Sequence, residues 1–269
     1  DVVAVNASSE DELAGHVEQA DALMVYHMIS LSRKTLEQLQ QCRLIVRCGV
    51  GYDNIDIHFA RKRRIDVVNI PDYGTEEVAD SAIGMALALA RGIHFLNSRL
   101  RAGQGPWSYS QAVPIGRLRG RVFGIVGLGR IGTATALRAK ALGMNVVFYD
   151  PYKPDGYDKA LGIRRVERLD VLLQESHVLS MHCPHTEETH HMIDAAALAR
   201  LPHGAYLVNT ARGAVADSAA IPGAIASGQL AGAAIDVLEE EPPSDKEPLV
   251  AAWRDPGHLA YHRVLINPH

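Results

Sequence analysis

Cysteine, long hydrophobic runs and charge of one sign are all scarce in this chain. Its three cysteines (Cys42, Cys48 and Cys183) are odd in number and form no CxxC pair, so neither a disulfide framework nor a zinc ribbon is indicated. The longest strongly apolar run, between Asp80 and Arg91, has about half the length that a membrane span requires. The formal net charge of −4 provides no broad basic field, so we expect neither nucleic acid nor a membrane as a partner.

The composition is otherwise that of an ordinary globular protein. Apolar residues make up 47% and charged residues 22% of the 269 residues, a length that suits one large domain or two ordinary ones. We expect no signal peptide at the start of the sequence, Asp1. We therefore expect a soluble, cytoplasmic protein.

Short apolar runs alternate with segments of helical periodicity along most of the chain. Early in the chain we expect strands at 2–5, 22–25, 44–46 and 67–70, and helices at 11–20, 33–40 and 57–63. A long helix at 75–102 and a loop-rich stretch at 103–120 follow. Later we expect strands at 122–126, 145–149, 178–181, 205–209, 233–237 and 264–266, and helices at 130–142, 168–175, 195–200 and 218–227. This alternation predicts an α/β fold with parallel sheets, in two lobes joined near Pro71.

A GxGxxG sequence lies between an expected strand and an expected helix. Gly127 permits a tight turn, Gly129 lets the backbone approach a pyrophosphate, and Gly132 lets the helix pack closely on the strand. Asp150 ends the next strand, where an acid binds ribose hydroxyls and disfavours a 2′-phosphate. The alternative is a glycine-rich turn followed by a turn-forming aspartate before Pro151. The full order of strand, glycines, helix and acid favours NAD.

Arg212 follows an expected strand, at the edge where open α/β sheets bind ligands. Its planar fork of donors suits a carboxylate. The alternative is a surface arginine that pairs with the helix starting near Asp217.

Glu241 and His269 also follow expected strands. By themselves, the four acids at 236–241 suit a solvated face, and a histidine at the chain end suits a frayed tail. If the two residues meet, however, the carboxylate holds the imidazole in one tautomer, which suits it to move a proton near neutral pH.

Together these stretches resemble the D-isomer-specific 2-hydroxyacid dehydrogenase family, and within it most of all the C-terminal-binding-protein branch. The resemblance extends over essentially the whole chain, and the following segments carry it: 46–56 (VRCGVGYDNID), 75–80 (TEEVAD), 127–132 (GLGRIG), 148–151 (FYDP), 207–213 (LVNTARG), 236–242 (DVLEEEP) and 267–269 (NPH). It implies a Rossmann-type doubly wound sheet for NAD at 72–269 and a smaller, flavodoxin-like substrate lobe at 1–71. The helix at 75–102 resembles the family's dimerisation element, which implies a homodimer.

The resemblance also implies roles for individual residues. Arg212 would bind the carboxylate and carbonyl of a 2-oxo acid, Glu241 would be the acid partner, and His269 the proton donor and acceptor. The substrate carboxylate would also be held from the first lobe, by Arg47, Val50 and Gly51. The cofactor would be bound by Gly127, Gly129, Arg130, Ile131, Gly132, Asp150, Cys183, Pro184, Thr189, Thr210, Ala211 and Asp236.

Two departures from the family pattern stand out. Family members have a further strand before Val2 and a segment after His269, so we expect these residues to be part of a longer chain. The stretch at 249–261 is longer than usual for the branch, and we interpret it as a surface insertion.

The main hypothesis is therefore an enzyme that transfers a hydride between NAD and a small 2-oxo or D-2-hydroxy acid. The alternative is an NAD-sensing dimeric corepressor-like module with little or no turnover. Formate oxidation on this scaffold pairs the histidine with glutamine, whereas this chain has Glu241. The histidines and cysteine at 182–191 fit no usual zinc spacing, and the cofactor resemblance accounts for that segment, so we expect no metal.

Overall fold

The computed structural model describes residues 1–26, 28–112 and 115–269, and these form two units, Asp1–Thr75 and Glu76–His269. The sequence places the junction near Pro71, a few residues before the observed boundary. That the first unit binds the substrate and the second unit binds NAD stays a prediction.

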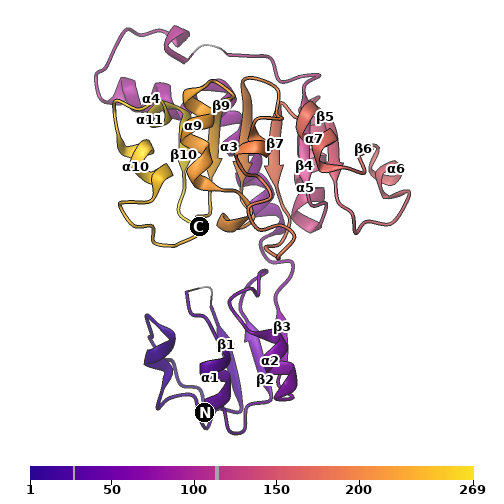
Figure 1. Cartoon of the computed structure of the whole chain (residues 1–269), viewed down its shortest axis with the longest axis vertical. Helices are drawn as coiled ribbons and strands as arrows, with labels where there is room; N and C mark the ends of the chain where they lie inside the picture. The colour runs from indigo at the N-terminus through magenta and orange to yellow at the C-terminus, as the bar shows by residue number, and fades with distance from the viewer. Residues whose placement is uncertain (27, 113–114) are drawn as a thin grey trace. The chain divides into compact units, whose positions relative to one another are not determined.

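The first unit is a three-stranded parallel sheet in the order β1-β2-β3 (Figure 1). Its elements are η1 (Glu10–Leu13), β1 (Ala22–Val25), α1 (Arg33–Gln38), β2 (Leu44–Arg47), α2 (Ile57–Lys62) and β3 (Asp66–Asn69). Leu36 from α1 and Ala60 from α2 pack with Ile45 of β2 in one core, and all three are fully buried. Hydrophobic burial on this face therefore holds both helices to the sheet.

Two predictions for this unit are wrong. The described residues 2–5 form no strand, and Val2 is 98% exposed. In place of the helix expected at 11–20, the chain makes one 3₁₀ turn, Glu10–Leu13. Gly15 then takes a positive φ of 84°, and its N–H donates to the Glu18 carboxylate instead of continuing a helix.

The second unit contains a seven-stranded, all-parallel sheet among its described residues. Its strands are β4 (Val122–Val126), β5 (Asn145–Tyr149), β6 (Arg164–Arg165), β7 (Val178–Met181), β8 (Ala205–Asn209), β9 (Leu230–Ile235) and β10 (Val264–Ile266). The spatial order is β10-β9-β8-β7-β4-β5-β6, so β5 and β6 are added on one side of β4 and β7 to β10 on the other, and the strand order switches between β4 and β7. In open α/β sheets this switch point is where a crevice for ligands forms. The α/β fold with a Rossmann-type sheet is confirmed.

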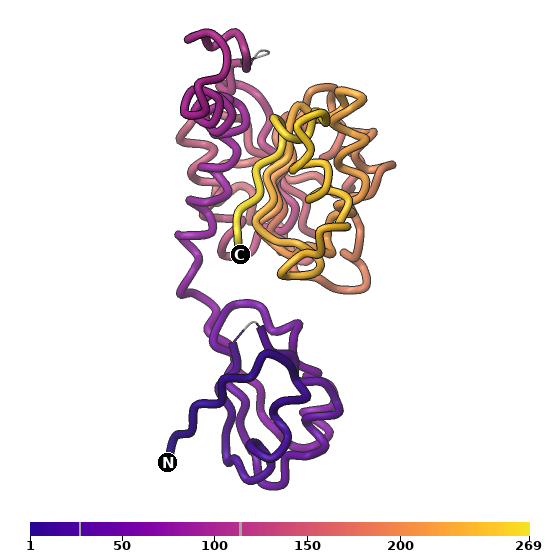
Figure 2. Tube along the Cα trace, turned by 90° about the vertical axis from the view of Figure 1, so that its left-hand side faces the viewer, coloured from indigo at the N-terminus to yellow at the C-terminus, as the bar shows by residue number. Residues whose placement is uncertain are grey.

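Helices cover both faces of this sheet (Figures 1 and 2). They are α3 (Thr75–Arg91), α4 (Ile93–Arg101), α5 (Arg130–Ala141), α6 (Tyr157–Leu161), α7 (Leu169–Glu175), α8 (Ala195–Leu198), α9 (Ile221–Ala226), α10 (Pro248–Arg254) and α11 (Ala260–Arg263), with 3₁₀ turns η2 (Tyr109–Ala112), η3 (Gly213–Val215) and η4 (Ser218–Ala220). One core cluster packs α3 and α5 against the sheet, and a second core cluster packs the helices α7, α8, α9, α10 and α11 against it. These two apolar layers explain why the central strands are buried on both sides.

The helix expected at 75–102 is broken at Gly92. This residue has φ 63°, and a Cβ there would lie 2.5 Å from the Cβ of Ala112. The chain bends by 66° between α3 and α4. Among the described residues, no single helix is long and apolar enough to span a membrane. The bent pair α3–α4 reaches the required length and apolar composition only when the two helices are counted together. The η2 turn lies in the expected loop, of which Val113 and Pro114 fall outside the described residues.

The stretch at 249–261 is not a surface insertion. It forms α10 and the beginning of α11, and Leu249, Val250 and Ala260 are all buried, each 2% exposed or less. Leu249 and Ala260 belong to the core cluster that covers one sheet face. The segment is therefore part of the helical layer.

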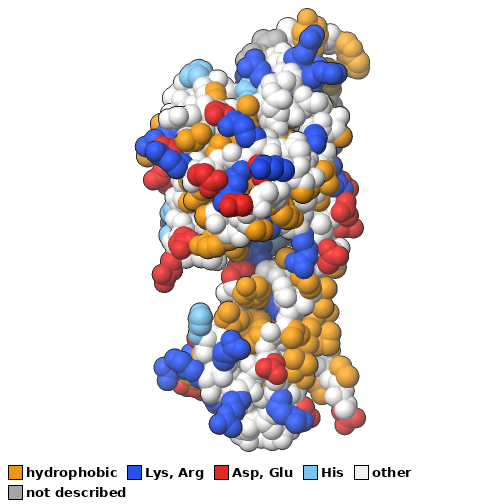
Figure 3. Space-filling model, turned by 90° about the vertical axis from the view of Figure 1, so that its right-hand side faces the viewer, with side chains coloured by type: hydrophobic (Ala, Val, Ile, Leu, Met, Phe, Trp, Pro, Cys, Tyr) orange, Lys and Arg blue, Asp and Glu red, His pale blue; other side chains and the backbone are white. Residues whose placement is uncertain are grey.

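Charged side chains of both signs are interspersed on the face of the second unit shown in Figure 3. The first unit carries several exposed apolar side chains, including Met24 (69%), Tyr26 (63%) and Val68 (45%).

Candidate active site

The carboxyl ends of β8, β9 and β10 lie side by side. The N–H of Asp236 donates to the carbonyl of Asn209 (3.0 Å), and the N–H of Asn267 donates to the carbonyl of Ile235 (3.0 Å). The three residues with expected catalytic roles follow these strand ends: Arg212, Glu241 and His269. They therefore leave the sheet at the edge where open α/β folds bind ligands.

Glu241 and His269 meet, as the pairing hypothesis requires. Nδ1 of His269 lies 2.9 Å from Oε2 of Glu241, and Oε1 of Glu241 accepts a hydrogen bond from the N–H of Leu238 (2.8 Å). Because a carboxylate only accepts, Nδ1 is the donor, and proton exchange falls to Nε2. The Glu241 side chain is 29% exposed and the His269 side chain 37% exposed, so the pair is accessible to a small molecule.

Arg212 sits in a turn that Asn209 organises. The Asn209 amide donates to the carbonyl of Arg212 (3.0 Å) and accepts from the N–H of Ala211 (3.1 Å), while Nη1 of Arg212 donates to the carbonyl of Ala211 (2.7 Å). A Cβ on Gly213 would lie 2.0 Å from the carbonyl carbon of Leu238. Only glycine fits there, so the backbone after Arg212 packs directly on the acid loop, which we define as residues 236–242.

The glycine turn after β4 has the form that the sequence predicts. Gly127 has φ 86° and lies under the backbone of Cys183, since a Cβ would come within 2.7 Å of its nitrogen. A Cβ on Gly132 would lie 2.1 Å from the carbonyl oxygen of Gly127, so close packing of α5 requires this glycine. A Cβ on Gly129 would meet no described atom within 4 Å.

This turn opens α5, whose first two residues are Arg130 and Ile131. Gly129 is the N-cap and supplies no side-chain cap, so the first N–H groups of the helix remain available to an anion. The open space at Gly129 together with this helix N-terminus fits a dinucleotide pyrophosphate.

Asp150 has a structural role that the sequence does not reveal. Its Oδ2 accepts from the N–H of Leu128 (2.8 Å) in the glycine turn, and its Oδ1 accepts from the N–H of Tyr152 (3.0 Å). A carboxylate has lone pairs for further donors, so the same group remains suited to ribose hydroxyls.

The segment after β7, residues 182–193, is named the cofactor loop here. His182 donates its backbone N–H to Val126 (2.8 Å), and burial lowers the pKa of its imidazole to about 3, so the ring is neutral near pH 7. Burial also raises the pKa of the Cys183 thiol to about 12, so this cysteine packs as an apolar group. The Thr189 hydroxyl donates to the carbonyl of Pro184 (2.7 Å), which closes the turn.

Three further predicted cofactor residues lie at the ends of β8 and β9. Thr210 and Ala211 are buried in the turn before Arg212, at 7% and 9% exposure. Asp236 follows β9, and its carboxylate accepts from the Asn267 side chain (2.9 Å). All three therefore belong to the carboxyl edge that also carries the Glu241–His269 pair.

The predicted substrate residues of the first unit gather at the end of β2. Arg47 is 7% exposed, and its guanidinium lies over Gly49, where a Cβ would come within 1.5 Å of Nη1. The side chain of Asn69 donates to the carbonyl of Val50 (2.7 Å), next to Gly51. These contacts concern the first unit alone.

Sequence reasoning missed two kinds of residue. Asn209 and Asn267 hold the turns of the site, and asparagine at a strand end before a turn is a recognisable signal for this. The pair formed by His191 and Glu239 (Nε2 to Oε2, 3.1 Å) is separated by 48 positions, and no local pattern indicates it.

Comparison with known proteins gives concordant findings. The family model described as the NAD-binding domain of D-isomer-specific 2-hydroxyacid dehydrogenases matches residues 83–269. A glyoxylate reductase of Korarchaeum cryptofilum is 37% identical over 262 residues, which cover 97% of this chain and 76% of that protein. A D-3-phosphoglycerate dehydrogenase of Methanocaldococcus jannaschii is 36% identical over 261 residues, which cover 97% of this chain but only 47% of that protein.

Solved structures show the same similarity. The crystal structure of a D-lactate dehydrogenase from Aquifex aeolicus, complexed with NAD and lactic acid, superimposes with a TM-score of 0.83 at 30% identity. That alignment covers 94% of this chain and 77% of the other.

Proposed function

Since the chain belongs to the D-isomer-specific 2-hydroxyacid dehydrogenase family, we propose that it is an NAD-dependent oxidoreductase that interconverts a small 2-oxo acid and its D-2-hydroxy acid. The observation that carries this proposal is the Glu241–His269 hydrogen bond, at the carboxyl edge of a sheet whose glycine turn fits a dinucleotide. A glyoxylate reductase and a D-lactate dehydrogenase among the similar proteins support a short 2-oxo acid as substrate.

The cofactor site follows from the second unit. The α5 N-terminus and Gly129 would hold the pyrophosphate, and Asp150 the adenosine ribose, where its charge disfavours a 2′-phosphate. When bound, NADH supplies the hydride that reduces the carbonyl carbon.

The chain's own residues then bind the substrate and move the proton. Arg212 pairs with the substrate carboxylate and stabilises the negative charge that develops on the carbonyl oxygen. His269 gives that oxygen a proton from Nε2, while Glu241 keeps the ring in its tautomer and orientation. In the first unit, Arg47, Val50 and Gly51 stay predicted substrate-binding residues.

The test is a panel of 2-oxo acids, including glyoxylate and pyruvate, incubated with the purified protein and either NADH or NADPH. We expect NADH consumption with at least one short 2-oxo acid, a preference for NADH over NADPH, and a D-configured product by chiral chromatography. An L-configured product, or NAD binding without turnover on any member of the panel, would contradict the proposal. The second outcome is the one that an NAD-sensing corepressor-like module predicts.

The finer resemblance to the C-terminal-binding-protein branch and the cytoplasmic location stay predictions. We also propose a homodimer formed through the α3–α4 region, because α4 buries none of its residues and the exposed apolar side chains Ile93 (57%), Trp107 (89%) and Tyr109 (72%) lie on or just after it. Light scattering coupled to size exclusion would contradict this by showing a monomer at micromolar concentration.

A further inference from the structure

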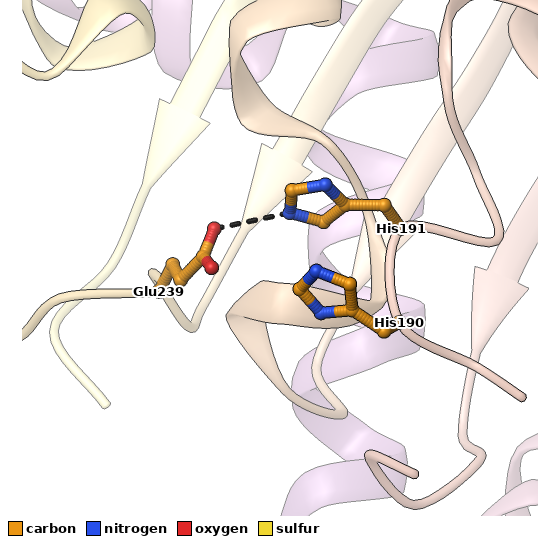
Figure 4. Close-up of side chains that lie close together, drawn as sticks. All are labelled: His190, His191 and Glu239. Carbon is orange, nitrogen blue, oxygen red and sulfur yellow. Dashed lines mark hydrogen bonds and ion pairs between the residues drawn. The ribbon is translucent and has the colours of Figure 1, made fainter. Parts of the chain in front are cut away.

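A cluster of potential metal ligands is formed by residues to which no individual role is assigned above. The expectation of no metal concerns the spacing within 182–191, whereas this cluster includes a carboxylate from a distant segment. His190 and His191 from the cofactor loop converge with Glu239 from the acid loop, and one ligand atom of each lies within 4.8 Å of the others (Figure 4). None of the three is needed for the reaction proposed above. We propose that these three residues bind one divalent transition-metal ion, of which Zn²⁺ is the representative.

The chemistry of the donor set suits such an ion. Two imidazoles and one carboxylate are the three protein ligands of a familiar class of zinc site, in which water takes the fourth position. In a tetrahedral site with bond lengths of about 2.0–2.1 Å, two ligand atoms are about 3.3 Å apart. Nε2 of His191 and Oε2 of Glu239 are already 3.1 Å apart, so an ion can replace the proton of their hydrogen bond with little movement.

The second histidine also has the surroundings of a ligand. Nδ1 of His190 lies 3.3 Å from Nε2 of His185, and metal-binding histidines commonly make a hydrogen bond with their other ring nitrogen, here to a second imidazole rather than to the more usual carboxylate or carbonyl. The rings of His190 and His191 are stacked with centroids 4.1 Å apart. Because ligation is in the plane of the ring, metal binding predicts that the two rings turn out of this stack.

The backbone on both sides holds the cluster in place. The N–H of His191 donates to the carbonyl of Ala214 (2.8 Å), and His191 takes the uncommon φ of 47° that aims its ring at Glu239. On the other side, Glu239 adjoins Leu238, whose backbone packs on Gly213. The backbone around His191 and Glu239 is therefore fixed before binding and loses little conformational entropy when the ion arrives, so the ordering cost is confined to the side chains that turn.

The experiment is a titration of Zn²⁺ into the untagged, metal-free protein, followed by calorimetry and by competition with a chromogenic chelator. We expect one ion per chain with a micromolar or lower Kd. Glu239→Gln and His191→Ala should each weaken binding at least tenfold. Co²⁺ should give the visible absorption of a tetrahedral site without a thiolate charge-transfer band, because Cys183 is not a ligand.

Matched controls decide between this site and adventitious binding. Glu240→Gln changes the neighbouring acid in the same loop, and His203→Ala removes another exposed histidine; both should bind Zn²⁺ as the wild type does. Zn²⁺ should also raise the Tm of the wild type and of both controls but not of Glu239→Gln. Unchanged affinity in Glu239→Gln, or equal losses in the controls, would overturn the proposal whatever the catalytic activity.

Discussion

Two glycines of the glycine turn after β4 are present for different physical reasons. Gly127 is required by the fold, because its φ is positive and the Cys183 backbone leaves no room for a Cβ. Gly129 has φ −71°, which any residue can adopt, and a Cβ there would meet no described atom within 4 Å. The role that we propose for Gly129 is therefore to leave space for the ligand rather than to permit the turn.

Replacing each of these two glycines by alanine should affect different properties: the stability of the fold in one case and the affinity for NAD in the other. Gly127→Ala should lower the free energy of unfolding by at least about 1–2 kcal/mol, the cost of a left-handed conformation at a residue with a Cβ, because the Cβ must also displace the Cys183 backbone. Gly129→Ala should leave stability nearly unchanged but weaken NAD binding at least about tenfold, since the Cβ fills the pyrophosphate cradle. Urea unfolding and calorimetry with NAD measure the two quantities. NAD affinity at the wild-type level in Gly129→Ala would contradict the assignment.

The buried histidine of the cofactor loop predicts a pH dependence of stability. The native pKa of His182, about 3, lies below the ordinary value of 6.5, so between these values the unfolded chain takes up a proton that the native state excludes. The free energy of unfolding should therefore fall as the pH drops below 6.5, by at most about 1.4 kcal/mol per pH unit from this group. His94 and His177, whose pKa values burial also lowers, add to the same trend.

Urea unfolding at about pH 7 and about pH 5 measures this dependence. His182→Gln keeps a hydrogen-bonding group toward Ser180 but cannot take up the proton, so its loss of stability on acidification should be smaller. His203→Gln, at an exposed position, is the control. The same pH dependence in His182→Gln and the wild type would show that His182 does not contribute.

Individual site residues were predictable where a short segment carries the chemistry. The glycines, Asp150 and Arg212 each stand at the end of a recognisable strand. The contacts between segments were not predictable, because pairing across many positions depends on the tertiary fold. The Asp150–Leu128 hydrogen bond and the His191–Glu239 pair are of this kind.

At the level of elements, the strands of the second unit were predicted better than the helices. Buried parallel strands such as β4, β5 and β8 are continuous apolar runs with glycine, aspartate or asparagine at their ends, a local signal. β6 has only two residues and was missed. The break after α3 was missed because helical periodicity continues through Gly92, while the close approach of Ala112 that fixes the bend comes from a later segment.

Replacing the glycine within α3 and the glycine after α3 by alanine should change the free energy of unfolding in opposite directions. Gly84 lies within α3 and a Cβ there would meet no described atom within 4 Å, so Gly84→Ala should raise the free energy of unfolding by about 0.5–1 kcal/mol. Gly92→Ala should lower it by about 1–3 kcal/mol, because φ is positive and the Ala112 side chain must move. Thermal unfolding of both variants beside the wild type measures this. A more stable Gly92→Ala would show that the bend is not required.

In the molecule as a whole, segments that are distant in sequence meet at one edge of a parallel sheet. The hydrogen bonds from Asp236 to Asn209 and from Asn267 to Ile235 place the three strand ends in register. Arg212, Glu241 and His269 follow these strand ends, so the sheet determines where their segments begin. The glycine turn follows β4, where the strand order reverses. The proposed catalysis therefore depends on the sheet, which positions residues from three separate loops, rather than on any one loop.

The most direct test of the central claim is the kcat for reduction of the best 2-oxo acid by NADH in His269→Gln. Glutamine can still hydrogen-bond to Glu241 but cannot give up a proton, so kcat should fall by about 10²–10⁴-fold, the usual contribution of a general acid, while the Kd for NADH stays unchanged. His203→Gln should retain wild-type turnover. A kcat for His269→Gln within a few-fold of the wild type would contradict the assignment of His269 as the proton donor and with it the mechanism proposed here.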